Sequence, residues 1–177
     1  MRRMLSVTLT GLVTAPLAGQ AAAAEMTVKV EIPRLNVAEY HRPYVAMWIE
    51  KADQSPVATL SVWYDGKLKN AEGTKWLKDM RQWWRKAGRD MTMPADGISG
   101  ATRAPGEHSL TFVDGKAPLG KLAAGEYQLV VEAAREVGGR ELIRVPFTWP
   151  PADTKAGKTV QVKGEHELGA VSLTTKP

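Results

Sequence analysis

Residues 125–149 read GEYQLVVEAAREVGGRELIRVPFTW, which is two runs rich in apolar and β-branched residues joined by Gly138 and Gly139. Runs of this kind are typical of β-strands, and a pair of glycines supplies the backbone freedom that a tight turn needs. The stretch therefore predicts a β-hairpin that turns at Gly138 and Gly139.

Other runs on both sides of this hairpin alternate apolar and polar residues with a period of two, which indicates half-buried strands. They cover residues 26–32, 43–51, 56–66, 108–115, 159–164 and 167–175. The expected inward-facing residues are Met26, Val28, Val30 and Ile32, then Val45, Met47 and Ile49, and then Val62 and Tyr64. Seven or eight short strands with turn signals between them predict a mainly β fold, an antiparallel β-sandwich of immunoglobulin-like architecture.

One segment departs from this pattern, because TKWLKDMRQWWRKAG (residues 74–88) spaces its apolar residues as a helix does. It predicts one amphipathic, Trp-rich helix with Thr74 as its N-cap and Gly88 at its C-terminus. Its apolar residues, expected to pack on the sandwich, are Trp76, Leu77, Met80, Trp83, Trp84 and Ala87. Residues 89–107 follow with two prolines, three glycines and no periodicity, which predicts a long loop.

The first residues have the pattern of an export signal: Arg2 and Arg3, an apolar run, and an Ala-rich end that fits cleavage after Ala24. We therefore expect residues 1–24 to be removed and residues 25–177 to form a single domain that is not membrane-embedded. Arg2 and Arg3 are the only charged residues among the first 24, so cleavage lowers the formal net charge from +5 to +3. That small excess gives no reason to expect nucleic acid as a partner.

The chain contains no cysteine. This excludes dithiol exchange, a thiolate-ligated iron–sulfur cluster and a thioether-linked haem. Glu165, His166 and Glu167 are consecutive, so on a strand they would point in different directions, and no metal site is predicted there. A redox role would require an organic cofactor or an unusual metal site.

The loop contains DGISGAT, residues 96–102. Gly97, Ser99 and Ala101 approximate the nucleophile elbow of serine hydrolases, but that elbow must follow a strand and open a helix. Here Pro94 precedes the stretch and Pro105 follows it, which makes hydrolysis by Ser99 a minor alternative.

DGISGAT resembles the flavin-attachment motif of exported bacterial flavoproteins. In that family an FAD:protein FMN transferase joins the FMN phosphate to the side-chain oxygen of the motif's last Thr or Ser. The resemblance implies that Thr102 carries covalent FMN, that Asp96 is the acid of the motif, and that the motif residues Ser99, Gly100 and Ala101 surround the attachment point.

Neighbouring residues supply candidates for the rest of the flavin site. Arg103 or Arg89 could neutralise the charge that the phosphodiester keeps. The isoalloxazine ring needs an apolar or aromatic bed, for which Trp83, Trp84 and Met93 are candidates.

A second resemblance covers most of the chain. The stretches VWYDGKLKNAEGTKWLKDMRQWW (62–84), DGISGATRAPGEHSLTF (96–112) and residues 125–149 resemble a family of predicted periplasmic proteins of unknown function. Its members are often encoded beside PepSY-type membrane proteins and the flavin transferase. The resemblance implies a flavin carrier in the periplasm that exchanges electrons with a PepSY-type membrane reductase or an extracytoplasmic acceptor, rather than an enzyme with its own substrate. The alternative is a non-catalytic periplasmic immunoglobulin-like binding or structural module without a cofactor.

Overall fold

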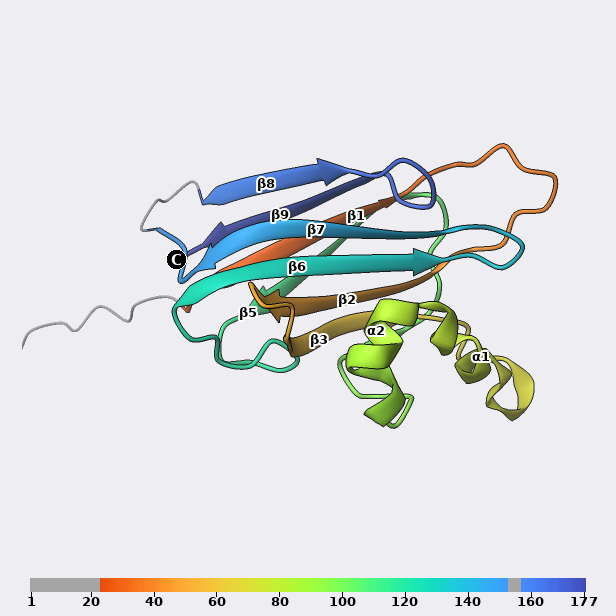
Figure 1. The fold of residues 1–177 in the computed structure, drawn as a ribbon, viewed down its shortest axis with the longest axis horizontal. Coiled ribbons are helices and arrows are strands. Elements are labelled where there is room, and N and C mark those ends of the chain that lie inside the picture. Colours follow the sequence, from red (N-terminus) through yellow and green to blue (C-terminus); the bar gives the residue numbers. More distant parts are fainter. Residues whose placement is uncertain (1–22, 153–156) are drawn as a thin grey trace, which may run out of the picture.

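The computed structural model describes residues 23–152 and 157–177, so nearly all of the expected export signal lies outside the described residues. Nine strands are present: β1 (Glu25–Ile32), β2 (Tyr44–Lys51), β3 (Pro56–Trp63), β4 (Ser99–Gly100), β5 (Gly106–Val113), β6 (Gly125–Ala134), β7 (Arg140–Trp149), β8 (Lys158–Lys163) and β9 (Ala170–Lys176). They form one sheet in the order β5-β1-β9-β8 and a second in the order β4-β3-β2-β6-β7. The two sheets pack face to face, which confirms the predicted β-sandwich (Figure 1).

The hairpin predicted from residues 125–149 is confirmed. Strands β6 and β7 pair without a register break from Gly125 opposite Trp149 to Ala134 opposite Arg140. In the turn, the Arg135 amide donates to the Gly139 carbonyl oxygen at 3.1 Å, and the Gly138 amide donates to the Arg135 carbonyl oxygen at 3.0 Å. The glycines thus close the turn between the two longest strands.

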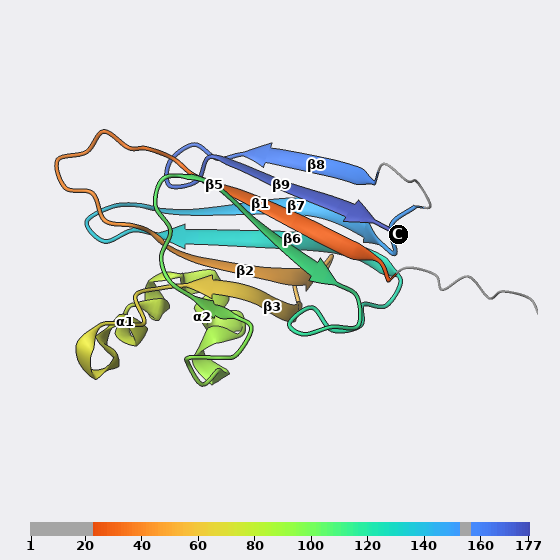
Figure 2. The same cartoon turned by 180° about the vertical axis from the view of Figure 1, so that it is seen from behind.

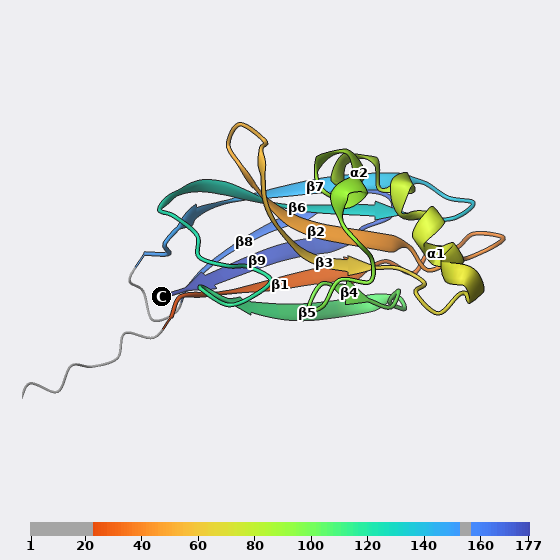
Figure 3. The same ribbon diagram turned by 90° about the horizontal axis from the view of Figure 1, so that it is seen from below.

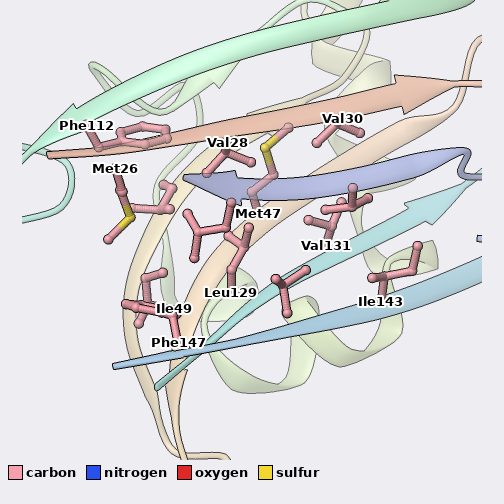
Figure 4. Close-up of a cluster of buried hydrophobic side chains, with 14 of the residues drawn as sticks. Met26, Val28, Val30, Met47, Ile49, Phe112, Leu129, Val131, Ile143 and Phe147 are labelled. Carbon is pink, nitrogen blue, oxygen red and sulfur yellow. The ribbon is translucent and has the colours of Figure 1, made fainter. Parts of the chain in front are cut away.

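The core between the sheets consists of the alternating apolar residues of both inner faces (Figure 4). Met26, Val28 and Val30 of β1 have no exposed surface, and neither have Val45, Met47 and Ile49 of β2. Burial of each such side chain stabilises the fold by about 1.5–3 kcal/mol. Alternation in the sequence therefore identified the inward faces of β1 and β2 correctly.

The prediction that Val62 and Tyr64 point inward is wrong. Both belong to a second, outer cluster of buried residues, whereas Leu60 and Trp63 of the same segment lie in the inter-sheet core. The pairing explains the change of face: Met47 is opposite Ser61 but Trp48 is opposite Thr59, so Leu60 is an extra residue in β3. Such a β-bulge reverses the alternation for every residue that follows.

The predicted continuous helix over residues 74–88 is also corrected. The segment consists of five short pieces: 3-10 turns at Lys69–Ala71, Leu77–Asp79 and Gly88–Asp90, and the helices α1 (Glu72–Lys75) and α2 (Arg81–Lys86). Thr74 lies inside α1 and its hydroxyl donates to the Ala71 carbonyl oxygen, so it is not an N-cap. Met80, with φ −78° and ψ 72°, interrupts the helix before α2.

Two buried carboxylates on the outer face of the second sheet hold α2 in place. Glu132 of β6 accepts hydrogen bonds from the backbone N–H groups of Gln82 and Trp83 at 2.8–3.1 Å, which satisfies the free donors of the first turn. Glu50 of β2 pairs with Lys86 at the other end of α2 at 2.6 Å. Sheet residues at both ends of α2 therefore fix a short segment that would not be a stable helix alone.

The outer cluster lies between this helical segment and the second sheet. It consists of Ala46, Trp48, Val62, Tyr64, Leu77, Met80, Trp83, Val130 and Ala134. Because β2 is covered on both faces, six consecutive residues of that strand, 45–50, are buried.

Three segments meet at one end of the sandwich: the β1–β2 connection, the turn between β6 and β7, and helix α1 (Figures 1 and 2). The start of β1 and the C-terminus lie at the opposite end. The candidate site lies at the end that carries α1 and the β6–β7 turn. Within the described part of the chain, no helix is long and apolar enough to cross a membrane.

Candidate functional site

The long loop predicted for residues 89–107 is present, and it contains short regular pieces. A 3-10 turn covers Gly88–Asp90, β5 already begins at Gly106, and Ser99 and Gly100 form β4. Strand β4 pairs in parallel with the edge of β3 (Figure 3). The amides of Val62 and Tyr64 donate to the carbonyl oxygens of Ile98 and Gly100 at 2.8 and 2.9 Å, so β3 fixes the path of the motif.

Ser99 belongs to the internal structure of this loop. Its hydroxyl oxygen accepts a hydrogen bond from the Ala95 amide at 2.9 Å, and its own amide donates to the Ala95 carbonyl oxygen at 2.9 Å. The adjacent Ile98 packs against the outer cluster. Since β4 is followed by extended chain and not by a helix, the backbone of a nucleophile elbow is not formed around Ser99.

Trp63 lies under the second half of the motif. A Cβ atom on Gly100 would lie 3.2 Å from Trp63 Cδ1, so the motif backbone approaches this indole closely. The Arg103 guanidinium lies 5.2 Å from the centre of the Trp63 ring, within the range of a cation–π contact. Arg103, expected to neutralise a phosphate, thus has an aromatic partner, while Asp96 and Ala101 are exposed.

Thr102 is partly exposed and lines a cavity of about 930 Å³ at the end of the sandwich. We call this the end cavity; its walls come from residues 40–44, 65–81 and 134–140, with Thr102 as the contribution of the motif. Its volume falls within the range of about 300–1,000 Å³ that is usual for small-molecule sites. No hydrogen bond joins the Thr102 hydroxyl to the rest of the described chain.

Apolar side chains that would normally be buried gather at this cavity. Among the described residues, five large apolar side chains are exposed, and three of them, Leu68, Trp76 and Val137, line it. Trp76 is 52% exposed, which contradicts the expectation that it packs on the sandwich. A cluster of exposed apolar side chains around a hollow is typical of a surface that binds a ligand or a partner.

Cationic side chains also line the end cavity. Arg81 is exposed and forms no ion pair with the described residues, whereas the Arg140 Nη1 atom lies 2.8 Å from Glu132 Oε1. Arg89, the other arginine expected to neutralise a phosphate, lies outside this lining. Arg81 is therefore better placed than Arg89 to meet an anionic group on Thr102.

The lining contains two buried polar atoms that lack hydrogen-bond partners in the described chain, Tyr40 Oη and Arg135 Nη1. Burial raises the pKa of Tyr40, and it also raises the pKa of Tyr44, so both phenols are neutral donors at neutral pH. The rest of the Arg135 guanidinium is held by Glu167, with Nε 2.8 Å from Oε2. An unpartnered buried donor costs about 1–3 kcal/mol.

Glu141 organises the backbone behind this wall. Its carboxylate accepts four hydrogen bonds of 2.7–3.0 Å from the amides of residues 165–168, including that of Glu167. Burial alone would raise the pKa of the Glu141 carboxyl, but the four N–H donors outweigh it and hold this pKa below its ordinary value. Residues 164–169 form a polar turn that is built around this carboxylate.

This arrangement predicts a pH-dependent contribution to stability. Because the folded pKa of Glu141 is depressed, its stabilisation is complete above the ordinary glutamate pKa of about 4.3 and is lost as the pH falls through the folded value. Glu141→Gln is expected to lower the free energy of unfolding at neutral pH, and the difference from wild type should shrink in acid. Urea unfolding of both proteins between neutral pH and about pH 3 measures this, and a difference independent of pH would contradict it.

The residues expected to contact the flavin ring do not line the end cavity. Trp83 is fully buried in the outer cluster and its Nε1 donates to Thr59 Oγ1 at 3.2 Å, so it is not available to a ligand. Trp84 lines a smaller hollow next to the end cavity, with Arg81 and Arg140 common to both, and Met93 packs against the outer cluster. Sequence reasoning missed Trp76, Leu68 and Val137; the last two are single apolar residues within otherwise polar turns, which is the signal that could have identified them.

The chain matches the model of a protein family. No curated protein matches the chain. The family described as "Predicted periplasmic protein (DUF2271)" matches residues 25–170, which is most of the chain and includes the motif and the whole end cavity. The chain belongs to this family of predicted periplasmic proteins of unknown function.

Proposed function

We propose that this protein is a periplasmic electron carrier with FMN covalently attached through its phosphate to Thr102. The observation that carries the proposal is the position of Thr102. It combines a partly exposed side chain, a hydroxyl without a partner in the described chain, and a place on the lining of a cavity large enough for a cofactor. Ser99, the other hydroxyl within the motif, is engaged with Ala95.

The attachment is a phosphoryl-group transfer from FAD, catalysed by an FAD:protein FMN transferase. The Thr102 hydroxyl oxygen attacks the FMN-side phosphorus of the FAD pyrophosphate, a P–O ester bond forms, and the P–O bond of the anhydride breaks. AMP leaves and the hydroxyl proton passes to a base of the transferase. Exposed Asp96 and Ala101 beside Thr102 leave the motif accessible to that enzyme.

The residues around Thr102 are suited to hold the product. The phosphodiester keeps one negative charge, which Arg81 on the same cavity lining can neutralise. Pairing of β4 with β3 fixes the backbone that leads to Thr102. When bound, FMN supplies reversible electron transfer, and the protein contributes the tether and the electrostatic surroundings.

The family description supports a periplasmic location. The family match begins at Glu25, the residue that follows the proposed cleavage site, and this supports removal of residues 1–24 and a single domain over residues 25–177. A covalent tether suits a protein outside the cytoplasm, because a dissociated FMN would be lost. The proposed electron partner is a PepSY-type membrane protein or an extracytoplasmic acceptor.

The experiment is co-expression of the exported protein with an active FMN transferase and, in parallel, with a transferase lacking activity. We expect intact mass to increase by FMN less one water, and flavin fluorescence to remain with the protein band after denaturing electrophoresis, only with the active transferase. An unmodified protein, with the transferase shown to modify a known substrate in the same cells, would contradict the proposal. That outcome would favour the cofactor-free binding module.

A further inference from the structure

We infer that the isoalloxazine ring of the tethered flavin lies in the end cavity with Trp76 as its aromatic contact. This inference rests on the proposed attachment to Thr102. It assigns a role to Trp76, which lies outside the DGISGAT motif, and it places the ring away from Trp83 and Trp84.

Large apolar side chains of the cavity lining are exposed to solvent. Trp76 is 52% exposed and Val137 is 73% exposed, although polar residues would be better solvated at both positions. Both line the cavity that Thr102 also lines, and they come from different segments, the residue that follows α1 and the β6–β7 turn. A flat aromatic ring between these segments would remove both side chains from water.

The same lining also contains polar residues, Tyr40 and Arg135. Tyr40 Oη and Arg135 Nη1 are donors that are buried without partners. An isoalloxazine ring has an apolar benzenoid end and an opposite end that carries carbonyl oxygens and ring nitrogens. A ligand with one apolar and one hydrogen-bond-accepting end matches a cavity whose lining combines exposed apolar side chains with the polar residues Tyr40 and Arg135.

The other tryptophans of the helical segment do not offer this combination. Trp83 has no exposed surface, and its position is fixed by Glu132 through its amide and by Thr59 through its indole N–H. Trp84 is partly exposed but lines the smaller hollow, which Thr102 does not line. Trp76 is therefore the tryptophan that a ring tethered to Thr102 can contact without unfolding the outer cluster.

The test measures the fluorescence of the attached flavin, because an indole in contact with an excited flavin quenches its emission by electron transfer. For each flavin-loaded protein, emission is divided by flavin absorbance, before and after denaturation. Wild type is expected to be strongly quenched until it is denatured. Trp76→Ala should raise the native emission at an unchanged level of attachment, with part of the quenching retained through Tyr40 and Tyr44 of the same lining. Trp76→Tyr, which retains an electron-donating ring, should restore most of the lost quenching.

Trp84→Ala is the matched control, since it removes a partly exposed indole from the same helical segment, and it should remain as quenched as wild type. Circular dichroism confirms that each variant is folded. Equal emission from wild type and Trp76→Ala, or loss of quenching in Trp84→Ala instead, would overturn the placement of the ring while leaving attachment to Thr102 intact. A wild-type protein that never acquires flavin would overturn both proposals.

Discussion

Replacement of Thr102 by alanine is expected to abolish covalent flavin attachment completely while leaving the fold intact. The side chain is partly exposed and forms no hydrogen bond within the described chain, so its loss should change the free energy of unfolding by only about 0.5 kcal/mol. Without the hydroxyl there is no oxygen to form the ester bond. In-gel fluorescence and intact mass after co-expression with the transferase measure the effect.

Three further variants test whether attachment depends on the hydroxyl at position 102 alone. Thr102→Ser supplies the same hydroxyl and should still be modified. Thr92→Ala removes another threonine from the same segment and should leave attachment unchanged, because Thr92 is exposed and outside the end cavity. Ser99→Ala removes the oxygen that accepts the Ala95 amide, so it should destabilise the loop by about 1 kcal/mol but still permit modification. Retention of the flavin by Thr102→Ala, or its loss in Thr92→Ala, would contradict the assignment.

Gly73→Ala is expected to cause the largest loss of stability, about 3 kcal/mol. Gly73 is buried in α1, and a Cβ atom there would lie 1.8 Å from the Asp65 carbonyl oxygen and 3.2 Å from Tyr44 Oη. Both residues line the end cavity, and a backbone oxygen cannot move aside as a flexible side chain can. The methyl group must therefore displace α1 from Asp65, and the preceding turn and Trp76 must move with α1.

Urea unfolding measures this loss as a fall in the transition midpoint. Gly66→Ala is the matched control in the same connection, because its Cβ atom would lie 3.5 Å or more from every other residue's atoms. That distance is ordinary van der Waals contact, so the control should remain within about 0.5 kcal/mol of wild type. Equal stability of Gly73→Ala and wild type would show that α1 does not pack as closely on Asp65 as described.

The strands were predictable because one side of each strand faces the core. Alternation identified β1 and β2, runs of apolar and β-branched residues identified β6 and β7, and the paired glycines identified the turn between the last two. The bulge at Leu60 was not predictable, since a one-residue offset depends on the pairing of β3 with β2 and leaves no local signal. For the same reason the faces of Val62 and Tyr64 were assigned incorrectly.

The helical segment differs from the prediction because tertiary contacts override its periodicity. Helical spacing made a single helix over residues 74–88 plausible, but Glu132 accepts the free amides at the start of α2 and Glu50 holds Lys86 at its end. Glu132 and Gln82 are 50 residues apart in the chain, so only the folded structure brings them together.

For the candidate site, the motif indicated the proposed attachment residue, Thr102, but not the residues that line the cavity around it. Thr102 was identified from seven residues, whereas the end cavity is assembled from three segments distant in sequence. Trp83 and Trp84 were chosen as ring contacts because they are close in sequence and aromatic. Trp76 was assigned to the packed face by the same periodicity that failed for the helix.

The measurement that tests the central claim most directly is mass spectrometry of the tryptic peptide that spans residues 90–103, taken from protein co-expressed with the transferase. Cleavage after Arg89 and Arg103 gives a peptide with three hydroxyl side chains, those of Thr92, Ser99 and Thr102. We expect this peptide to carry the mass of FMN less one water, with fragment ions that place the whole addition on Thr102. An addition on Thr92 or Ser99, or an unmodified peptide from cells in which the transferase is active, would contradict the account.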